Sequence, residues 1–302
     1  MNQKDVIKIL KLGRFHFLGA GFFSFTAGAL LAVILNTPFS WERFILGYMV
    51  LFPAHLSVSY SNDYFDVDVD KHGQPTLFTG GSGILVENPH LRPFAKKFAL
   101  FLISCSVIFS LIFTIYFNVP LFFIITIIGI FLAWYYSSPP LKLSYRGWGE
   151  LAMVSTGFIV PSLGYLAISG YLDLQSVIFT LPLMFYQVLF IINVEIPDME
   201  SDLNGGKRTF IVNHGRKTGF KLIGISGAIS TILFMLMGLS NLYKMPDFRL
   251  VALISLLPTV MGLWSFLNRT TEKKKATQLS THTLASLFAF IIILNVYFLT
   301  LL

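Results

Sequence analysis

The sequence predicts an all-α membrane protein, a bundle of nine transmembrane helices. Hydrophobic residues make up 55% of the 302-residue chain, and charged residues only 12%. A typical soluble domain carries about 25% charged residues, so a protein with half that share could not cover its surface in water. The chain also contains a series of apolar stretches of about 20 residues, the length that a bilayer-spanning helix needs. Lipid is therefore the expected solvent for most of the surface.

Nine apolar stretches are bounded by polar residues, glycine or proline. They cover residues 15–36, 43–62, 95–117, 119–136, 149–169, 174–195, 218–239, 247–268 and 281–301. The first follows a basic segment, as in a signal peptide, but its apolar part is long enough to stay in the membrane as an anchor. We find no linker or low-complexity segment between the stretches. Residues 1–302 are therefore predicted to form a single polytopic domain.

The basic residues predict the orientation of the bundle. Cytoplasmic loops of membrane proteins carry an excess of Lys and Arg. If the N-terminus is inside and there are nine spans, only Arg43, Lys244 and Arg249 of the 22 basic residues fall outside. The net charge of +7 then reflects topology, and no nucleic-acid partner is needed to explain it. We expect a multi-pass protein of the cell membrane.

Cysteine usage excludes two kinds of site. Cys105 is the single cysteine of the sequence and lies in an apolar stretch. One thiol cannot form an internal disulfide, and it cannot build a thiolate metal centre. We interpret Cys105 as a small buried hydrophobic residue.

Acidic residues are concentrated in two octets, residues 63–70 and 195–202. Eight of the 15 Asp and Glu residues lie there, and both octets have the spacing acid, two residues, Asp, one residue, acid, one residue, Asp. The octets follow the second and sixth predicted spans, so both are expected at the cytoplasmic ends of those helices. This match suggests a parallel internal duplication.

Helical periodicity predicts a polar face in each octet, since residues at i, i+3 or i+4 and i+7 lie on one side of a helix. The first face contains Asn62, Asp63, Asp66 and Asp70, with Ser59 and His55 deeper in the membrane. The second contains Glu195, Asp198 and Asp202, with Ile191 and Gln187 deeper. Asp68 and Glu200 point elsewhere and are expected to be solvated.

Two facing carboxylate clusters would repel each other unless a cation lies between them. Ligand sets made only of oxygen favour hard ions such as Mg²⁺, which often binds a substrate phosphate as well. The alternative is a pair of solvated acidic loop ends, but the matched pattern in a chain with few acids argues against it.

Candidate phosphate ligands follow both octets. Gly205 and Gly206 precede Lys207 and Arg208 after the second octet, and the glycine-rich stretch 79–83 follows the first. Such a stretch could present backbone N–H groups to an anion. The loop after the fourth span adds Tyr136 and Lys142, although Lys142 could equally be an ordinary cytoplasmic charge.

These motifs resemble those of the UbiA superfamily of intramembrane prenyltransferases. Residues 62–70 match the signature NDxxDxxxD, residues 198–202 match DxxxD, and residues 136–142 resemble the tyrosine–lysine motif between helices four and five. The chain is most similar to the branch that prenylates 1,4-dihydroxy-2-naphthoate, given Asn-Asp-Tyr-Phe-Asp at 62–66, Thr-Gly-Gly-Ser-Gly at 79–83 and residues 145–150. It departs from that branch at residues 194–197, where Val-Glu-Ile-Pro replaces an Asn-Asn-x-Arg pattern.

The resemblance implies transfer of a polyprenyl group from an isoprenyl diphosphate to an aromatic acceptor such as a dihydroxynaphthoate, through an allylic carbocation and with release of diphosphate. It implies two Mg²⁺ ions held by Asn62, Asp66, Asp70, Asp198 and Asp202. Diphosphate would be bound by Lys142, Lys207, Arg208 and Tyr136. Secondary positions in catalysis would be those of Asp63, Glu195 and Ser137. The acceptor pocket would contain His55, Ser59 and Gln187.

Other functions are compatible with parts of the pattern. Prenyl transfer to a non-aromatic lipid is one. A cation transporter is another, but the acids lie at helix ends rather than at mid-span. A phosphatidyltransferase of the CDP-alcohol type would require a DGxxAR sequence, which is absent. His55 could also be a buried histidine bonded to a neighbouring backbone instead of an acceptor ligand.

Overall fold

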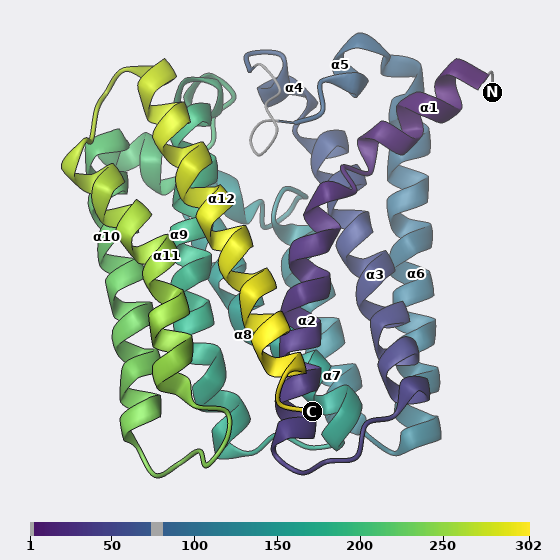
Figure 1. The fold of residues 1–302 in the computed structure, drawn as a ribbon. Coiled ribbons are helices and arrows are strands. Elements are labelled where there is room, and N and C mark those ends of the chain that lie inside the picture. Colours follow the sequence, from purple (N-terminus) through teal and green to yellow (C-terminus); the bar gives the residue numbers. More distant parts are fainter. Residues whose placement is uncertain (1–2, 74–80) are drawn as a thin grey trace.

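The computed structural model describes residues 3–73 and 81–302, which fold into a bundle of long helices with short helices at one end (Figure 1). In chain order the elements are α1 (Gln3–Leu12), α2 (His16–Ile34), α3 (Trp41–Phe65), α4 (Val67–Asp70), α5 (Ile84–Glu87), η1 (Pro89–Leu91), α6 (Arg92–Phe117), α7 (Pro120–Tyr135), η2 (Leu143–Tyr145), α8 (Gly149–Ser169), α9 (Leu174–Asn204), α10 (Phe210–Leu239), α11 (Phe248–Leu267) and α12 (Lys273–Leu299). The all-helical prediction is confirmed for the described residues.

Eight helices of the described chain are long and apolar enough to cross a membrane, and they match eight of the nine predicted stretches. The remaining stretch, 119–136, corresponds to α7, which has 16 residues. At 1.5 Å per residue α7 would rise about 24 Å, less than the hydrocarbon core of about 30 Å. The helix is short because the chain turns at Tyr136, ahead of two prolines that cannot continue a helix.

Both helices that carry octets extend beyond their predicted ends. The prediction ended the spans at Asn62 and Glu195, before or at the first acid, whereas α3 reaches Phe65 and α9 reaches Asn204. The second octet is helical throughout. The first is not, because the helix breaks at Asp66 (φ −97°, ψ 10°) and resumes as α4. The helix that carries the first polar face is therefore interrupted at Asp66.

The two acids that were expected to be solvated differ from each other. Asp68 is exposed, with a single ion pair to Lys71 at 2.7 Å. Glu200 is half-exposed and accepts both terminal nitrogens of the buried Arg216 at 2.6 Å, with Lys273 at 3.6 Å. Glu200 therefore points away from the cavity as expected, but it also has ion pairs, because the kink of α10 at Gly215 (φ 77°) brings Arg216 against the end of α9.

Close contact between α2 and α8 joins the two sides of the bundle. A Cβ atom on Gly28 would lie 1.9 Å from the carbonyl oxygen of Pro161, and one on Gly164 would lie 1.9 Å from that of Phe25. Helices in lipid associate through packing rather than through the hydrophobic effect, and small residues allow the backbones to approach.

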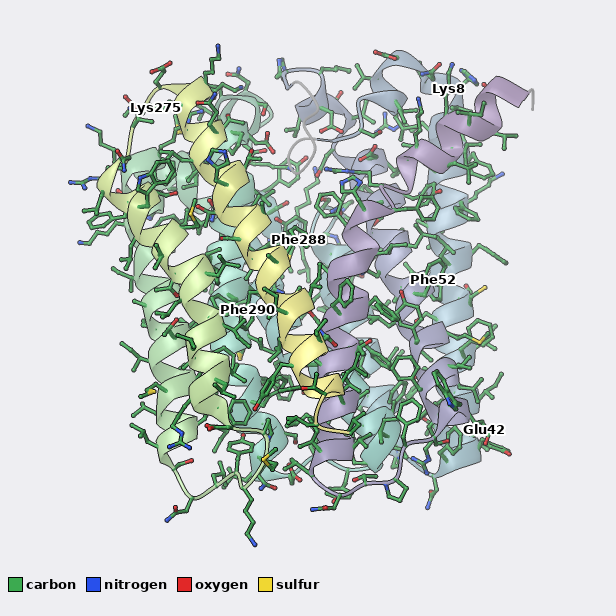
Figure 2. The ribbon with its side chains drawn as sticks, viewed as in Figure 1. Lys8, Glu42, Phe52, Lys275, Phe288 and Phe290 are labelled. Carbon is green, nitrogen blue, oxygen red and sulfur yellow. The ribbon has the colours of Figure 1, made fainter. Side chains whose placement is uncertain are left out.

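The chain termini lie at opposite ends of the bundle (Figure 1). Lys8 and Lys275 lie at the end that carries α4 and α5, and Glu42 lies at the other end (Figure 2). The first acidic octet, which ends in α4, therefore lies at the same end of the bundle as Lys8 and Lys275.

The α2–α8 contact generates a stability prediction. Gly28→Ala and Gly164→Ala should each lower the thermal unfolding midpoint of the detergent-solubilised protein, because the new methyl group overlaps a backbone oxygen, a clash that typically costs about 1–3 kcal/mol or more. Gly19→Ala, with no atom within 4 Å of its Cβ position, is the matched control and should leave the midpoint unchanged or raise it slightly. Equal effects of the three substitutions would contradict this close contact.

Candidate active site

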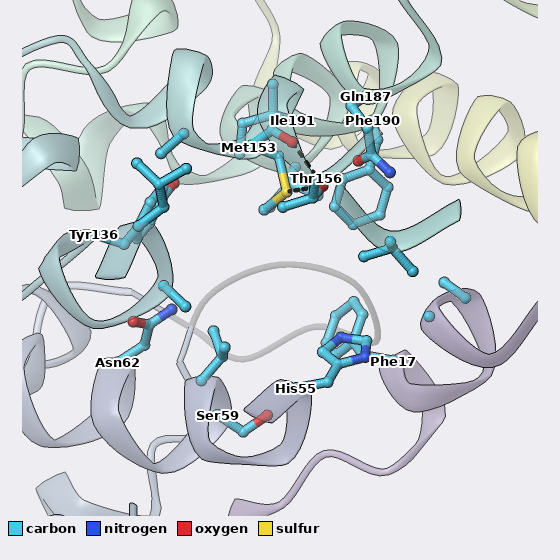
Figure 3. Close-up of a pocket in the computed structure, with 18 of the residues that line it drawn as sticks. Phe17, His55, Ser59, Asn62, Tyr136, Met153, Thr156, Gln187, Phe190 and Ile191 are labelled. Atoms are coloured by element: carbon cyan, nitrogen blue, oxygen red, sulfur yellow. Dashed lines mark hydrogen bonds between the residues drawn. The ribbon is translucent and has the colours of Figure 1, made fainter. Parts of the chain in front are cut away.

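A cavity of about 420 Å³ lies inside the bundle, within the size range of small-molecule sites. Its wall is built from α2, α3, α7, α8, α9 and α12, and it includes every residue predicted for the two polar faces. Figure 3 shows Asn62, Ser59 and His55 along α3, facing Gln187, Phe190 and Ile191 of α9 across the cavity. The acidic octets form one end of this cavity, and mostly apolar side chains line the rest.

Asp66 is the most heavily bonded carboxylate of the first octet. It is 5% exposed, and it accepts hydrogen bonds from Ser137 Oγ at 2.9 Å, Tyr145 hydroxyl at 2.8 Å and Lys207 Nζ at 2.9 Å. The break between α3 and α4 places the side chain at this meeting point. Ser137, which was predicted to have a secondary position in catalysis, therefore donates a hydrogen bond to a predicted metal ligand. Tyr145 is a further partner that the sequence analysis did not single out.

Lys207 connects the two octets. Its Nζ lies 2.9 Å from Asp66 Oδ2 and 3.8 Å from Asp202 Oδ1, with all three side chains largely buried. Burial lowers the pKa of Lys207, but the carboxylates of Asp66 and Asp202 outweigh it and raise this pKa well above its ordinary value. The ammonium group is therefore charged and partly neutralises a carboxylate from each octet.

The two octets also approach each other through the backbone. A Cβ atom on Gly205, directly after α9, would lie 2.4 Å from Val69 Cγ2 in α4. Only glycine fits this contact without displacing α4. The glycine after the second octet thus serves close packing, whereas the sequence suggested only a flexible phosphate loop.

The segment after the first octet turns back onto it. Thr79 and Gly80 of the predicted glycine-rich stretch lie outside the described residues. Ser82 donates its backbone N–H and its hydroxyl to Asp63, and the Gly81 N–H donates to Asp70. These donors are used by carboxylates, and they are not left free for an anion.

Asp70 lies against this segment, and nearby donors and cations only partly offset the burial of its carboxyl group. Burial, followed by the charges of Asp63 and Asp66, raises the pKa of Asp70 to about 7. The carboxyl group therefore keeps its proton to a higher pH than a free aspartate would, and a cation that binds there must compete with that proton. Burial, and next the charge of Glu195, also raises the pKa of Tyr136, so its phenol stays protonated.

The predicted diphosphate ligands are not all on the cavity wall. Lys207 and Tyr136 line it, but Arg208 is exposed. Lys142 has its Nζ 4.7 Å from the centre of the Tyr145 ring and does not line the cavity. Both side chains are nevertheless close in sequence to residues that do line it.

Arg14 is a cavity residue that the sequence analysis used only as a topological charge. It joins α1 to α2 in the left-handed region, with φ of 43°, an uncommon conformation for a non-glycine residue. Its guanidinium group lines the cavity and experiences the charges of Asp63, Asp70 and Asp198. Among the described Lys and Arg residues, only Arg14 and Lys207 line the cavity. Its place as the last basic residue before the first apolar stretch was the available signal.

The donor atoms at this end fit a hard cation. Asn62 Oδ1 is buried and has no hydrogen-bond partner in the described chain, and the nearby acids of both octets offer further oxygens. Within residues 3–73 and 81–302, no three His, Cys, Asp or Glu side chains form a complete metal-binding group. A cation here would therefore take part of its coordination from amide, water or ligand oxygens, as Mg²⁺ commonly does.

The apolar part of the cavity contains the predicted acceptor residues. His55 packs against Gly21, where a Cβ atom would lie 2.4 Å from its Nδ1. In the described residues its ring has no hydrogen-bond partner. The backbone hydrogen bond expected for a structural histidine is therefore not observed there. Ser59 and Gln187 line the same space, and Phe17 and Phe190 contribute aromatic walls (Figure 3).

Comparison with known proteins relates this cavity to a family. The chain is 23% identical over 229 residues to the 1,4-dihydroxy-2-naphthoate octaprenyltransferase of Bacillus subtilis (strain 168), covering 74% of this chain and 70% of that protein. Its fold is similar to a UbiA homolog from Archaeoglobus fulgidus bound to DMAPP and Mg²⁺, with a TM-score of 0.66, 15% identity, and coverage of 94% of this chain and 99% of that one. The same homolog bound to GPP and Mg²⁺ gives a TM-score of 0.63 at 15% identity, with the same coverage.

Residues 22–290 match the UbiA prenyltransferase family as a whole. The match includes both octets and every helix from α3 to α11. The protein therefore belongs to the UbiA prenyltransferase family and is a prenyltransferase.

Proposed function

We propose that the protein transfers a polyprenyl group from an isoprenyl diphosphate to an aromatic acceptor of quinone biosynthesis, inside the membrane and with Mg²⁺. The observation that carries this proposal is the meeting of two buried acidic octets at one end of an apolar cavity. The Bacillus subtilis relative supports a dihydroxynaphthoate as acceptor, and the homolog bound to DMAPP or GPP with Mg²⁺ supports the donor and the ion. Membership of the UbiA prenyltransferase family argues against the cation-transporter and phosphatidyltransferase alternatives.

The proposed metal ligands are Asn62, Asp66, Asp70, Asp198 and Asp202, which would hold two ions. Bound there, Mg²⁺ would neutralise charge that develops on the diphosphate. Arg14 and Lys207, the two cations on the wall, would contact diphosphate oxygens, and Arg208 and Lys142 would add positive charge at the rim. Fixed cations of this kind stabilise the departing diphosphate more than the bound ester, because cleavage of the C–O bond adds a negative charge to it, and this difference accelerates its departure.

Reaction begins when the bond between the allylic carbon and the diphosphate oxygen breaks, with both electrons leaving on oxygen. The allylic cation is then attacked by a ring carbon of the acceptor, and the ring subsequently loses a proton. Apolar walls keep water from the cation. The Tyr136 ring, which lines the cavity near the octets, would stabilise the cation through its face.

The acceptor would lie in the apolar part of the cavity. His55 offers two ring nitrogens that have no partner among the described residues, and Ser59 and Gln187 offer further hydrogen bonds to a phenolic hydroxyl. The sequence departure at residues 194–197 lies on α9 beside this region, so a non-aromatic lipid acceptor is the alternative outcome of the assay below.

We also propose nine membrane crossings within one domain of residues 1–302, with the octets at the cytoplasmic face of the cell membrane. Termini at opposite ends of the bundle (Figure 1) require an odd number of crossings, and α7 adds a ninth to the eight long helices. The bias of basic residues supports an N-terminus inside.

The metal hypothesis predicts that Asp66→Asn and Asp198→Asn each reduce prenyl transfer by about 100-fold or more, since each removes a ligand that acts on the departing diphosphate. The assay follows diphosphate release and product mass with geranylgeranyl diphosphate, 1,4-dihydroxy-2-naphthoate and other acceptors. Asp68→Asn is the matched control, because Asp68 belongs to the same octet but is exposed. Near wild-type rates in Asp66→Asn at saturating Mg²⁺ would reject the hypothesis.

The acceptor hypothesis predicts a separation of kinetic constants in His55→Ala. The acceptor KM should rise, or turnover fall, by about tenfold, while the KM for the prenyl diphosphate changes little. His282→Ala on exposed α12 surface serves as the control. A variant that is only less stable, with both KM values unchanged, would remove His55 from the acceptor site.

The topology proposal predicts selective labelling of single cysteines in a Cys105→Ser background. Lys244→Cys, in the exposed α10–α11 loop, should react with a membrane-impermeant maleimide in intact cells, whereas Asn204→Cys, exposed at the end of α9, should react only after the cells are opened. Labelling of Asn204→Cys in intact cells would reverse the assigned orientation.

A further inference from the structure

The first acid of each octet is buried and accepts a backbone N–H from the segment that follows its octet. Asp63 is 3% exposed and Glu195 is 4% exposed. Each accepts a backbone N–H from a residue that follows later in the chain, Ser82 for Asp63 and Ile211 for Glu195. The same position in both octets therefore binds the segment that leaves the site.

The bond to Asp63 fixes the start of α5. The Ser82 N–H lies 3.2 Å from Asp63 Oδ2, and the Ser82 hydroxyl also donates to that carboxylate. Ser82 Oγ in turn accepts the Ile84 N–H at 3.2 Å. Asp63 thus holds the turn at Ser82 and Gly83 through three linked bonds.

The bond to Glu195 fixes the start of α10. Helix starts leave N–H groups without intrahelical partners, and three consecutive ones are satisfied here by different side chains. Phe210 N–H donates to Glu150 of α8, Ile211 N–H to Glu195 at 3.4 Å, and Val212 N–H to Thr209 Oγ1 at 3.3 Å.

Each fixed segment then contacts a proposed metal ligand. A Cβ atom on Gly81, next to Ser82, would lie 1.9 Å from Asp70 Oδ2. Lys207, three residues before α10, contacts Asp66 and Asp202. A loose turn at Ser82 or a loose start of α10 would therefore release Asp70 or Lys207 from its present position.

We infer that Asp63 and Glu195, the latter with Glu150, are positioning residues that fix the segments carrying Gly81 and Lys207, and that neither is a metal ligand. The hydrogen bonds are features of the structure. The role of the site that they support rests on the proposed function. The rival role is concrete for Glu195, because its Oε1 is buried and, within the described residues, has no donor assigned to it, so it could serve as a ligand oxygen.

The first experiment counts metal ions directly. Mn²⁺ binding to the purified, detergent-solubilised full-length protein is measured by electron paramagnetic resonance for Asp63→Asn, Glu195→Gln, Asp66→Asn and the control Asp68→Asn. Asn and Gln keep an oxygen that accepts the N–H bond. We expect Asp63→Asn and Glu195→Gln to bind Mn²⁺ with wild-type stoichiometry and within about threefold of wild-type affinity, whereas Asp66→Asn weakens it by about tenfold or more. Weakening in Asp63→Asn or Glu195→Gln equal to that in Asp66→Asn would overturn the inference.

The second experiment removes the accepting oxygen. Asp63→Ala should raise amide hydrogen exchange at least about fivefold in residues 81–87 but not in 209–213, and Glu195→Ala should do the reverse, because each releases a different segment. In the transfer assay both Ala variants should raise the donor KM, and the Asn and Gln variants should restore it. Unchanged exchange in the Ala variants would also overturn the inference. Metal counts and exchange need no enzymatic activity, so absence of prenyl transfer in the wild type would reject the proposed function without touching this result.

Discussion

Carboxylates packed inside an otherwise apolar bundle repel each other and lose the solvation that water would give them. Much of the surrounding structure offsets this repulsion and desolvation. Lys207 places one ammonium group between Asp66 and Asp202, and two hydroxyl groups donate to Asp66. Arg216 compensates Glu200 on the outer side of α9. Asp63 and Asp66 both line the cavity, and protein donors bond both of them. Burial and hydrogen bonding are therefore combined in the same carboxylates.

Much of the site could be predicted because periodicity is a local property. The spacing of the octets placed all the polar-face residues on the cavity wall, although α3 breaks at Asp66. Arg14 was missed because its role depends on the left-handed turn between α1 and α2. Glu150 and Arg216 were missed for a related reason, since their partners lie 60 and 16 residues away and no pattern in the sequence pairs them. The predicted ends of the two octet-bearing helices came too early, in segments where acidic residues have partners distant in the sequence.

The two halves of the site are related by motif but not by backbone. The second octet stays inside α9, whereas the first is divided by a turn that directs Asp66 towards Lys207 and Tyr145. The turn brings Val69 against Gly205, so the two octets pack directly on each other. An exact internal repeat would not produce this contact. Because of this asymmetry the two halves contribute differently. Asp66 of the first octet accepts a hydrogen bond from Lys207, which follows the second octet.

The length of α7 has a consequence for the depth of the chemistry. A helix of 16 residues rises about 24 Å, whereas α6, which precedes it, has 26 residues and rises about 39 Å. The segment after α7, with Tyr136, Ser137 and Tyr145, therefore begins below the level of the neighbouring helix ends. Hydrophobic mismatch of this kind thins the surrounding bilayer or draws polar groups down into it. A lipid-tailed diphosphate could then reach the carboxylates without lifting its chain out of the membrane.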